Sequence, residues 1–268
     1  MDWWLAYLAI GATVGFLAGL LGIGGGMVMV PMLAFVFTAK GFPLEHLMHL
    51  SLATSMATIL FTPVASVGAH HRHGAVDWAV AKSMAPGIVA GALLCSIGAG
   101  FVPTQPLAIF FSCFLFYAAL QMFVEVKSNP LRKLPGPGGL FAAGAAIGGF
   151  SSLLAADGAF LSIPFFVRCN VPLKRATGTA AANGFPIAMA GTLGYVIQGS
   201  RVSGLPEWSL GYVYLPAMAL IVATSMPLAP LGARLAHRLP VKPLCVSCSR
   251  SRCLHSRCAW PGRSSQVS

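Results

Sequence analysis

Acidic residues are scarce in this 268-residue chain, which contains 6 Asp and Glu against 17 Lys and Arg. Charged residues of both signs make up only 9% of the chain, whereas a soluble domain carries about 25%, because charges cover its surface. The sequence also lacks a P-loop, a carboxylate pair and a Ser, His and Asp set with catalytic spacing. These absences exclude an ordinary soluble domain and an ATP-driven machine, and they argue against an enzyme.

Long apolar runs take the place of the missing charge, since hydrophobic residues make up 56% of the chain. A helix needs roughly 20 apolar residues to cross a bilayer. The runs that approach this length are Trp3 to Leu21, His49 to Ala69, Trp78 to Val102, Gln105 to Val124, Leu140 to Ala156, Thr177 to Gln198 and Leu210 to Leu231. Met27 to Ala39 and Phe160 to Val167 are shorter and indicate half-spans or re-entrant arms. The sequence therefore predicts an all-α membrane protein, a polytopic helical bundle.

One apolar stretch is interrupted by small residues in each half of the chain. Leu20 to Pro31 reads LLGIGGGMVMVP, and Leu153 to Pro164 reads LLAADGAFLSIP. In hydrocarbon an unwound backbone persists only where it is buried in protein or faces a water-filled cavity. Broken helices at corresponding places in two halves are typical of the binding site of a secondary transporter. We therefore expect a cavity, with Gly22 to Gly26 and Ala155 to Ala159 near the centre and facing each other.

Basic residues give an orientation through the positive-inside rule, which places short Lys- and Arg-rich loops in the cytoplasm. They cluster around residue 72 and at 127–133, 168–175 and 234–242. If each break joins two arms into a hairpin, these clusters share one side, and only Lys40 and Arg201 lie outside. Each full half then holds an odd number of segments, so the two repeats are inverted. The predicted organisation is a first transmembrane repeat at 1–126, a basic cytoplasmic linker at 127–137, a second repeat at 138–240 and an irregular tail at 241–268.

The second half also matches the first beyond the breaks. Leu52 to His70 and Arg175 to Tyr195 both place small and hydroxyl-bearing residues before a proline and then a glycine. The hydroxyl residues near the predicted helix starts are Thr54, Ser55, Thr177 and Thr179. Free N–H groups and the positive end of the helix dipole favour an anion there. A structural cap would use the same residues, so both a substrate role and a capping role stay open.

GLLGIGGGMVMVP in the first half, with SSLLAADGAFLSIPFF and VPLKRATGTAAANGFPIAMAGTLGY in the second, carry a resemblance to a known family. Together they resemble the TauE/SafE-type sulfite exporter family, over roughly residues 8 to 240. The resemblance implies a multi-pass carrier in a bacterial inner (plasma) membrane for a small anionic sulfur compound. It does not identify the substrate, because a fold does not fix a function.

The chain is therefore predicted to be a secondary transporter that exports small anions of the sulfite, sulfonate or sulfoacetate type, coupled to an ion gradient or running downhill. No cofactor, metal or nucleic acid is expected; the partners are the anion and the lipid bilayer, and a homo-oligomer is left open. The candidate substrate-binding residues are Gly22, Gly24, Gly25, Gly26, Thr54, Ser55, Asp157, Gly158, Thr177, Thr179 and Asn183. The alternatives are a membrane-embedded enzyme or metal-handling protein, and a carrier copy inactivated by loss of its last helix.

Asp157 departs from the family pattern, in which the second break is usually as glycine-rich as the first. The segment here reads Ala155-Ala156-Asp157-Gly158-Ala159. An ionisable residue at membrane depth is rare and usually functional. Because a carboxylate repels a dianion, Asp157 could carry a proton or pair with an arginine. Capping of the helix that starts near Phe160 is the equally open alternative.

The tail is the second departure, because family members usually end in one more apolar helix. The residues that resemble a zinc site there are Cys245, Cys248, Cys253, Cys258 and His255. A structural zinc site needs a small fold around it, however, and this segment has no apolar pattern. A change of reading frame that replaced the last helix explains the abrupt switch better.

Truncation after Lys242 is therefore expected to change expression and transport little. Each of the four arginines beyond it would cost about 2.5–3.5 kcal/mol at the centre of a membrane helix, so no span should form there. Expression level and anion flux of the truncated and full chains test this, and an apolar helix restored at that place should raise stability. Loss of folding on truncation, or zinc bound at Cys245 and Cys248, would contradict the interpretation.

Overall fold

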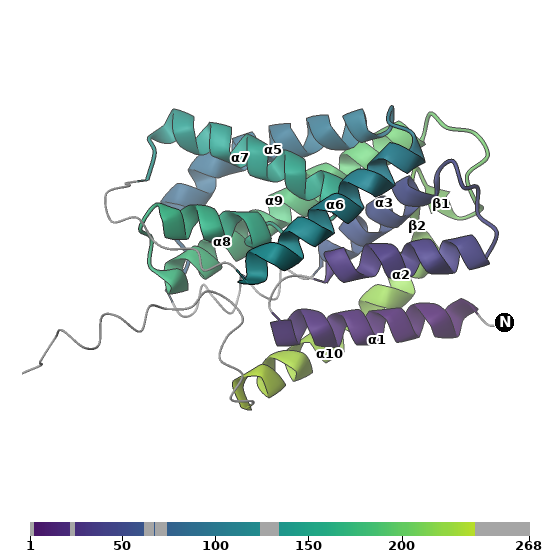
Figure 1. Ribbon diagram of the computed structural model, residues 1–268, viewed down its shortest axis with the longest axis horizontal. Coiled ribbons are helices and arrows are strands. Elements are labelled where there is room, and N and C mark those ends of the chain that lie inside the picture. The colour runs from purple at the N-terminus through teal and green to yellow at the C-terminus, as the bar shows by residue number, and fades with distance from the viewer. Residues whose placement is uncertain (1–2, 22–24, 62–66, 68–73, 124–133, 239–268) are drawn as a thin grey trace, which may run out of the picture.

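The computed structural model describes residues 3–21, 25–61, 67, 74–123 and 134–238, and these are almost entirely helical (Figure 1). The helices are α1 Trp3–Leu21, α2 Gly26–Ala39, α3 Leu47–Ile59, α5 Trp78–Ala99, α6 Thr104–Phe123, α7 Pro137–Leu154, α8 Ala159–Arg168, α9 Leu173–Gly199 and α10 Leu215–Arg238. Two short strands, β1 Ser209–Leu210 and β2 Val213–Tyr214, pair antiparallel, Ser209 opposite Tyr214. The prediction of an all-α protein is confirmed.

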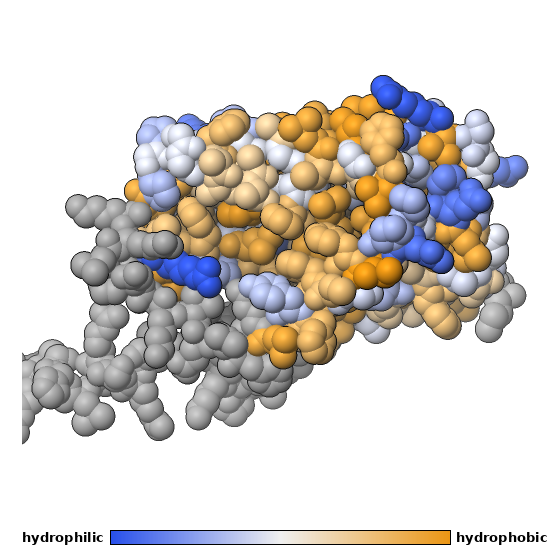
Figure 2. All heavy atoms as spheres, turned by 45° about the horizontal axis from the view of Figure 1, so that its top comes forward, coloured by the Kyte–Doolittle hydropathy of each residue, from blue (hydrophilic) through white to orange (hydrophobic). Residues whose placement is uncertain are grey.

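The apolar runs found in the sequence correspond closely to the helices. Among the described residues, α5, α7 and α9 are long and apolar enough to cross a membrane, and the other helices contain shorter apolar stretches of 10–17 residues. The short arms α2 and α8 begin directly after the two breaks, as expected. Figure 2 shows that the middle of one face is largely hydrophobic, with strongly hydrophilic residues mainly towards its ends. Such a surface suits lipid around its middle and water at its ends.

The start of the last predicted run is wrong, because Leu210 to Tyr214 belong to the β-hairpin and not to α10. The predicted run His49 to Ala69 is also too long for one helix, because α3 ends at Ile59. The turn residue Gly211 has a positive φ of 58°, and a Cβ there would overlap the carbonyl of Val196 in α9. The side chains of Tyr212, Val213 and Tyr214 are buried. An apolar run does not distinguish such a buried hairpin from one more helical turn, because both bury the same side chains.

Helices of different halves pack together in two equivalent pairs. α1 lies along α10, and α7 lies along α5, as the lower and upper edges of Figure 1 show. Gly11 meets Ile221 and Gly15 meets Ser225, so α1 and α10 run parallel. Small residues at such positions let two helix backbones approach closely within lipid. The α1 and α10 pair is thus held by direct backbone contact.

The α5 and α7 pair is built in the same way. Gly87 of α5 meets Phe141 of α7, and Gly91 meets Ala145, so these helices are parallel as well. A Cβ at either glycine would overlap main-chain atoms of α7. α1, the first helix of the first half, therefore packs against α10, which follows α9 in the second half. In the same way α7, the first helix of the second half, packs against α5, which follows α3 in the first half. This exchange is the one expected if the halves are related by a twofold axis, and their inverted orientation remains a proposal.

The two ends of the bundle are defined by contacts at the ends of α9. We call them the Lys40 end, at the right in Figure 1, and the Lys174 end. At the Lys40 end, Lys40 Nζ donates to the Tyr214 hydroxyl at 2.6 Å, and the last residue of α9, Gly199, contacts Tyr212. At the Lys174 end, Gly178 near the start of α9 lies against the carbonyl of Ala75. The basic loops at 68–73 and 124–133 lie outside the described residues.

Candidate functional site

The two helix breaks meet inside the protein. Gly26, the first residue of α2, lies against the carbonyl oxygen of Ala155 and the Cδ1 atom of Ile59, and a Cβ there would overlap both. Gly26, Ala155 and Ala156 are all buried. The prediction that the breaks face each other is therefore confirmed for the described part of both. The candidate residues Gly22 and Gly24 lie outside the described residues.

The second break is a sharp reversal of the chain between α7 and α8. Helix α7 ends at Leu154, and Ala155 adopts the left-handed conformation with φ 44° and ψ 37°. The N–H of Ala156 donates to the carbonyl of Ser151 at 3.0 Å, and the hydroxyl of Tyr195 in α9 donates to the carbonyl of Ser152 at 3.2 Å. These bonds satisfy carbonyl groups that the end of a helix leaves open. The unwound backbone of the second break therefore has hydrogen-bond partners within the protein.

The first break is held by α3 in a similar way. Ser55 Oγ donates to the carbonyl of Gly26 at 3.4 Å. The N–H of Met29 donates to the carbonyl of Gly25 at 3.0 Å, which starts the hydrogen-bond ladder of α2. Gly26, the first residue of α2, thus lies beside Ala155, four residues before α8 begins at Ala159. Free N–H groups and the positive dipole end at the start of a helix favour an anion.

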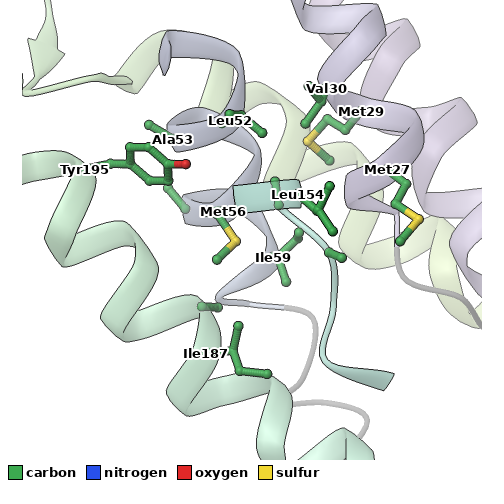
Figure 3. Close-up of a cluster of buried hydrophobic side chains, with 14 of the residues drawn as sticks. Met27, Met29, Val30, Leu52, Ala53, Met56, Ile59, Leu154, Ile187 and Tyr195 are labelled. Carbon is green, nitrogen blue, oxygen red and sulfur yellow. The ribbon is translucent and has the colours of Figure 1, made fainter. Parts of the chain in front are cut away.

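We call the contact of Gly26 with the second break at 155–159 the crossing. Apolar side chains from three helices surround it. Figure 3 shows Met56 and Ile59 of α3, Leu154 of α7 and Ile187 of α9 beside it. All four side chains are almost completely buried. Ile187 Cδ1 lies where a Cβ on Gly158 would be, and Met56 Cε lies against Gly191 of α9 in the same way. Gly158 thus allows Ile187 to pack directly on the second break, and Gly191 allows Met56 to pack closely against α9.

Asn183 adds a polar group to the crossing from α9. Its side chain is 1% exposed, and its main chain lies next to Gly158. Nδ2 faces the sulfur of Met84 at 3.9 Å, whereas Oδ1 is buried with no hydrogen-bond partner in the described part of the chain. A buried amide normally finds partners for both of its ends. Asn183 therefore has hydrogen-bonding capacity that the described residues leave unused.

Asp157 lies in the second break, between Ala156 and Gly158. Its Oδ1 atom is buried and has no hydrogen-bond partner among the described residues, and its carboxyl group faces the N–H of Gly158. The N-cap position of α8 is Gly158, which has no side chain to cap with. Asp157 lies one residue before this position, so the capping role and the proton-carrying role both stay open. Burying a carboxyl group without a partner for one oxygen costs less free energy when the group is protonated than when it is ionised.

The three candidate threonines bind the backbone elsewhere. Thr54 Oγ1 accepts the N–H of Tyr214 at 3.0 Å, and Thr179 Oγ1 accepts the N–H of Asp77 at 3.0 Å. Thr177 donates within α9, to the carbonyls of residues 173 and 174. The structure therefore places Gly26, with Ser55, against Ala155 of the second break, and Asn183 beside Gly158 of the same break. Asp157 lies between these two contacts in the chain, Gly25 faces α1, and the threonines have other contacts.

Some residues of the crossing are absent from the sequence-based candidates. Tyr195 and Ile187 lie in an apolar run, where each reads as an ordinary packing residue. A tyrosine in such a run must find a partner for its hydroxyl group, and this was the one available signal. In the part of the chain that the structure describes, no group of three or more His, Cys, Asp or Glu could hold a metal ion. The tail cysteines considered for zinc lie outside that part.

These features define a helical membrane transporter in which two broken helices meet inside the protein. The family model described as Sulfite exporter TauE/SafE matches residues 7–246, so the chain belongs to this family. A probable membrane transporter protein of Haemophilus influenzae is 35% identical over 241 residues, covering 90% of this chain and 91% of the relative. A probable membrane transporter protein of Methanocaldococcus jannaschii is 24% identical, covering 90% of each chain. No solved structure matches significantly.

Paired substitutions test the contacts at the crossing. Gly158→Ala is expected to lower the free energy of unfolding by about 1–3 kcal/mol through overpacking, and Ile187→Val should recover most of that loss because it removes the overlapping Cδ1 atom. Gly26→Ala should be destabilising in the same way, but Ile59→Val should not rescue it, because the Ala155 carbonyl still overlaps.

Melting temperatures of the single and double variants in detergent measure both cycles. Rescue of Gly26→Ala by Ile59→Val, or no rescue of Gly158→Ala by Ile187→Val, would contradict the described packing of the breaks.

Proposed function

We propose that this protein is a multi-pass secondary transporter of the bacterial inner (plasma) membrane that exports a small sulfur-containing anion of the sulfite, sulfonate or sulfoacetate type. The observation that carries the proposal is the contact of Gly26 with the Ala155 carbonyl, which places the start of α2 against the second break, four residues before α8 begins. Half-helices that point their N-termini at an anionic group near the bilayer midplane are a recurring transporter design. The family description supports the class of anion.

The chemistry of the crossing suits an anion that must be released again. The first N–H groups of two helices offer partial positive charge without the full charge of an arginine. Ser55 of α3 and Asn183 of α9 carry a hydroxyl and an amide donor; these now donate to the Gly26 carbonyl and the Met84 sulfur, so each would change partner to donate to the anion. Oxyanions accept several hydrogen bonds at once, so N–H, hydroxyl and amide groups can replace part of their hydration shell. An enzyme would instead need reactive side chains directed at one point, and the proposed set contains only one ionisable group.

The proposed orientation places the Lys174 end in the cytoplasm. Arg168, Lys174 and Arg175 lie in the described residues at that end, whereas Lys40 and Arg201 lie at the other. The larger number of basic residues supports this orientation under the positive-inside rule. We keep the proposed repeats at 1–126 and 138–240, the linker at 127–137 and the tail at 241–268. Transport then runs from the Lys174 end, past the crossing, to the Lys40 end.

Reconstitution into liposomes tests the function. Purified protein is expected to carry labelled sulfite or a labelled sulfonate faster than sulfate or thiosulfate, and protein-free liposomes give the leak rate. Gly26→Ala provides a second control, since it disturbs the crossing and should abolish the flux. Equal leak-level rates for every anion, by a protein that elutes and melts as a folded species, would overturn the proposal.

Asp157 is the residue proposed to couple transport to protons. Asp157→Asn keeps the shape of the side chain but cannot exchange a proton, so it should abolish transport driven by a pH gradient. Counterflow exchange of labelled for unlabelled anion needs no net proton movement and should remain within about threefold of the parent rate. Glu207→Gln is the matched control, because it removes an exposed carboxylate far from the breaks and should leave both rates unchanged. Unchanged pH-driven transport in Asp157→Asn would refute the coupling role.

A further inference from the structure

Two hydrogen bonds of the same construction lie at opposite ends of the protein. Thr54 of α3 accepts the N–H of Tyr214, the residue directly before α10, and Thr179 of α9 accepts the N–H of Asp77, the residue directly before α5. Both bonds are 3.0 Å long, and the two threonine side chains are 0% and 2% exposed. Each bond therefore fixes the start of a helix from one half of the chain to a buried hydroxyl of the other half.

Sequence register does not explain the likeness of the two bonds. Thr54 lies nine residues before Pro63 (63 − 54), whereas Thr179 lies seven residues before Pro186 (186 − 179). The residue that matches Thr54 in the repeat is Thr177, which bonds only within its own helix. The two halves thus arrive at the same hydrogen bond from different positions. Such a coincidence points to a requirement for the bond itself.

Each bond lies beside further contacts that close its end of the bundle. At the Lys40 end, Lys40 donates to the Tyr214 hydroxyl, and its Nζ lies 4.6 Å from the centre of the Tyr214 ring and 5.1 Å from that of Phe42. At the Lys174 end, Gly178, next to Thr179, lies against the carbonyl of Ala75. Asp77 also accepts the N–H of Val80 and so caps α5. The sequence signal for this cap is an aspartate directly before an apolar helix.

The remaining contacts divide the molecule around these bonds. The α1–α10 and α5–α7 pairs are each packed by backbone contact at several glycines. Helices α3 and α9 contact each other and carry Ser55 and Asn183 to the crossing. The Thr54 bond joins α3 to the α1–α10 pair, and the Thr179 bond joins α9 to the α5–α7 pair, which α9 also contacts along α5, where Gly194 lies against Ser96 and the Leu93 carbonyl. A single hydrogen bond between neutral groups contributes modestly and can break and re-form.

We propose that Thr54 and Thr179 are positioning residues that close the two ends of the transport path in turn. The Thr54 bond closes the path from the crossing to the Lys40 end, and the Thr179 bond closes the path to the Lys174 end. Both bonds are formed in this structure, which is therefore closed at both ends. The inference rests on the proposed transport function for its purpose, but the opening of each end is a property of the protein alone.

Accessibility of the crossing from each side of the membrane tests the inference. The reporter is Ala156→Cys, at a buried position of the second break, in a chain whose seven native cysteines are replaced by serine or alanine. A membrane-impermeant maleimide is applied to right-side-out and to inside-out vesicles. Thr54→Val is expected to raise the labelling rate at least threefold from the Lys40 side only, and Thr179→Val at least threefold from the Lys174 side only.

Matched variants separate the inter-half bond from general destabilisation. Thr58→Val removes a buried hydroxyl of α3 whose bond within the described residues is to the Thr54 carbonyl of its own helix, so it should leave labelling at the parent rate on both sides. Thr54→Ser and Thr179→Ser keep the accepting oxygen and should restore the parent rates. If a valine variant does not fold, the alanine variant at the same position must give the same side-selective increase.

Increases on the same side for both threonines, or no increase in either folded variant, would overturn the inference. The assay needs no anion, so it stands apart from the proposed function. Side-selective labelling in a protein that carries none of the tested anions would support the Thr54 and Thr179 bonds and refute the anion carrier. Anion flux without side-selective labelling would support the anion carrier and refute the role proposed for the Thr54 and Thr179 bonds.

Discussion

Within the membrane every backbone N–H and C=O group needs a hydrogen-bond partner, and the rest of this structure depends on that constraint. Two breaks in apolar helices would leave several such groups open, and at the lipid surface they would be costly. The protein meets this need by placing the breaks against each other and covering them. The Ser55 hydroxyl donates to the Gly26 carbonyl, and the Tyr195 hydroxyl donates to the Ser152 carbonyl. The N–H of Ala156 donates to the Ser151 carbonyl. In the proposed function, N–H groups at the starts of α2 and α8 receive the anion.

Packing between the halves keeps the breaks together. The glycines of α1 and α5 allow α10 and α7 to approach at backbone distance, and each of these pairs joins an early helix of one half to a later helix of the other. Because hydrocarbon gives no hydrophobic force between helices, close packing of this kind supplies much of the attraction. Neither half can therefore hold its break in place without the other, so the fold and the candidate site arise from the same contacts.

The fold could be predicted from the sequence largely because a membrane helix is a local feature. Apolar runs gave the bounds of α1, α2 and α8 within a residue or so, and the broken motifs located the crossing before any contact was known. The partners of Thr54 and Thr179 could not be predicted, because Tyr214 and Asp77 are distant in sequence and contribute only main-chain N–H groups. The β-hairpin was missed because its apolar residues continue directly into the apolar run of α10, although tyrosine and valine favour strands. The environment of Asp157 also depends on α9, which no local pattern describes.

An experimental structure of the protein in a lipid nanodisc with sulfite present would test the central claim most directly. The account predicts Gly26 in contact with the Ala155 carbonyl midway between the two membrane faces, and density for the anion against the first N–H groups of α2 and α8. Separate breaks, each facing lipid, would contradict it. So would an anion bound only among the basic residues of the Lys174 end, with none at the crossing.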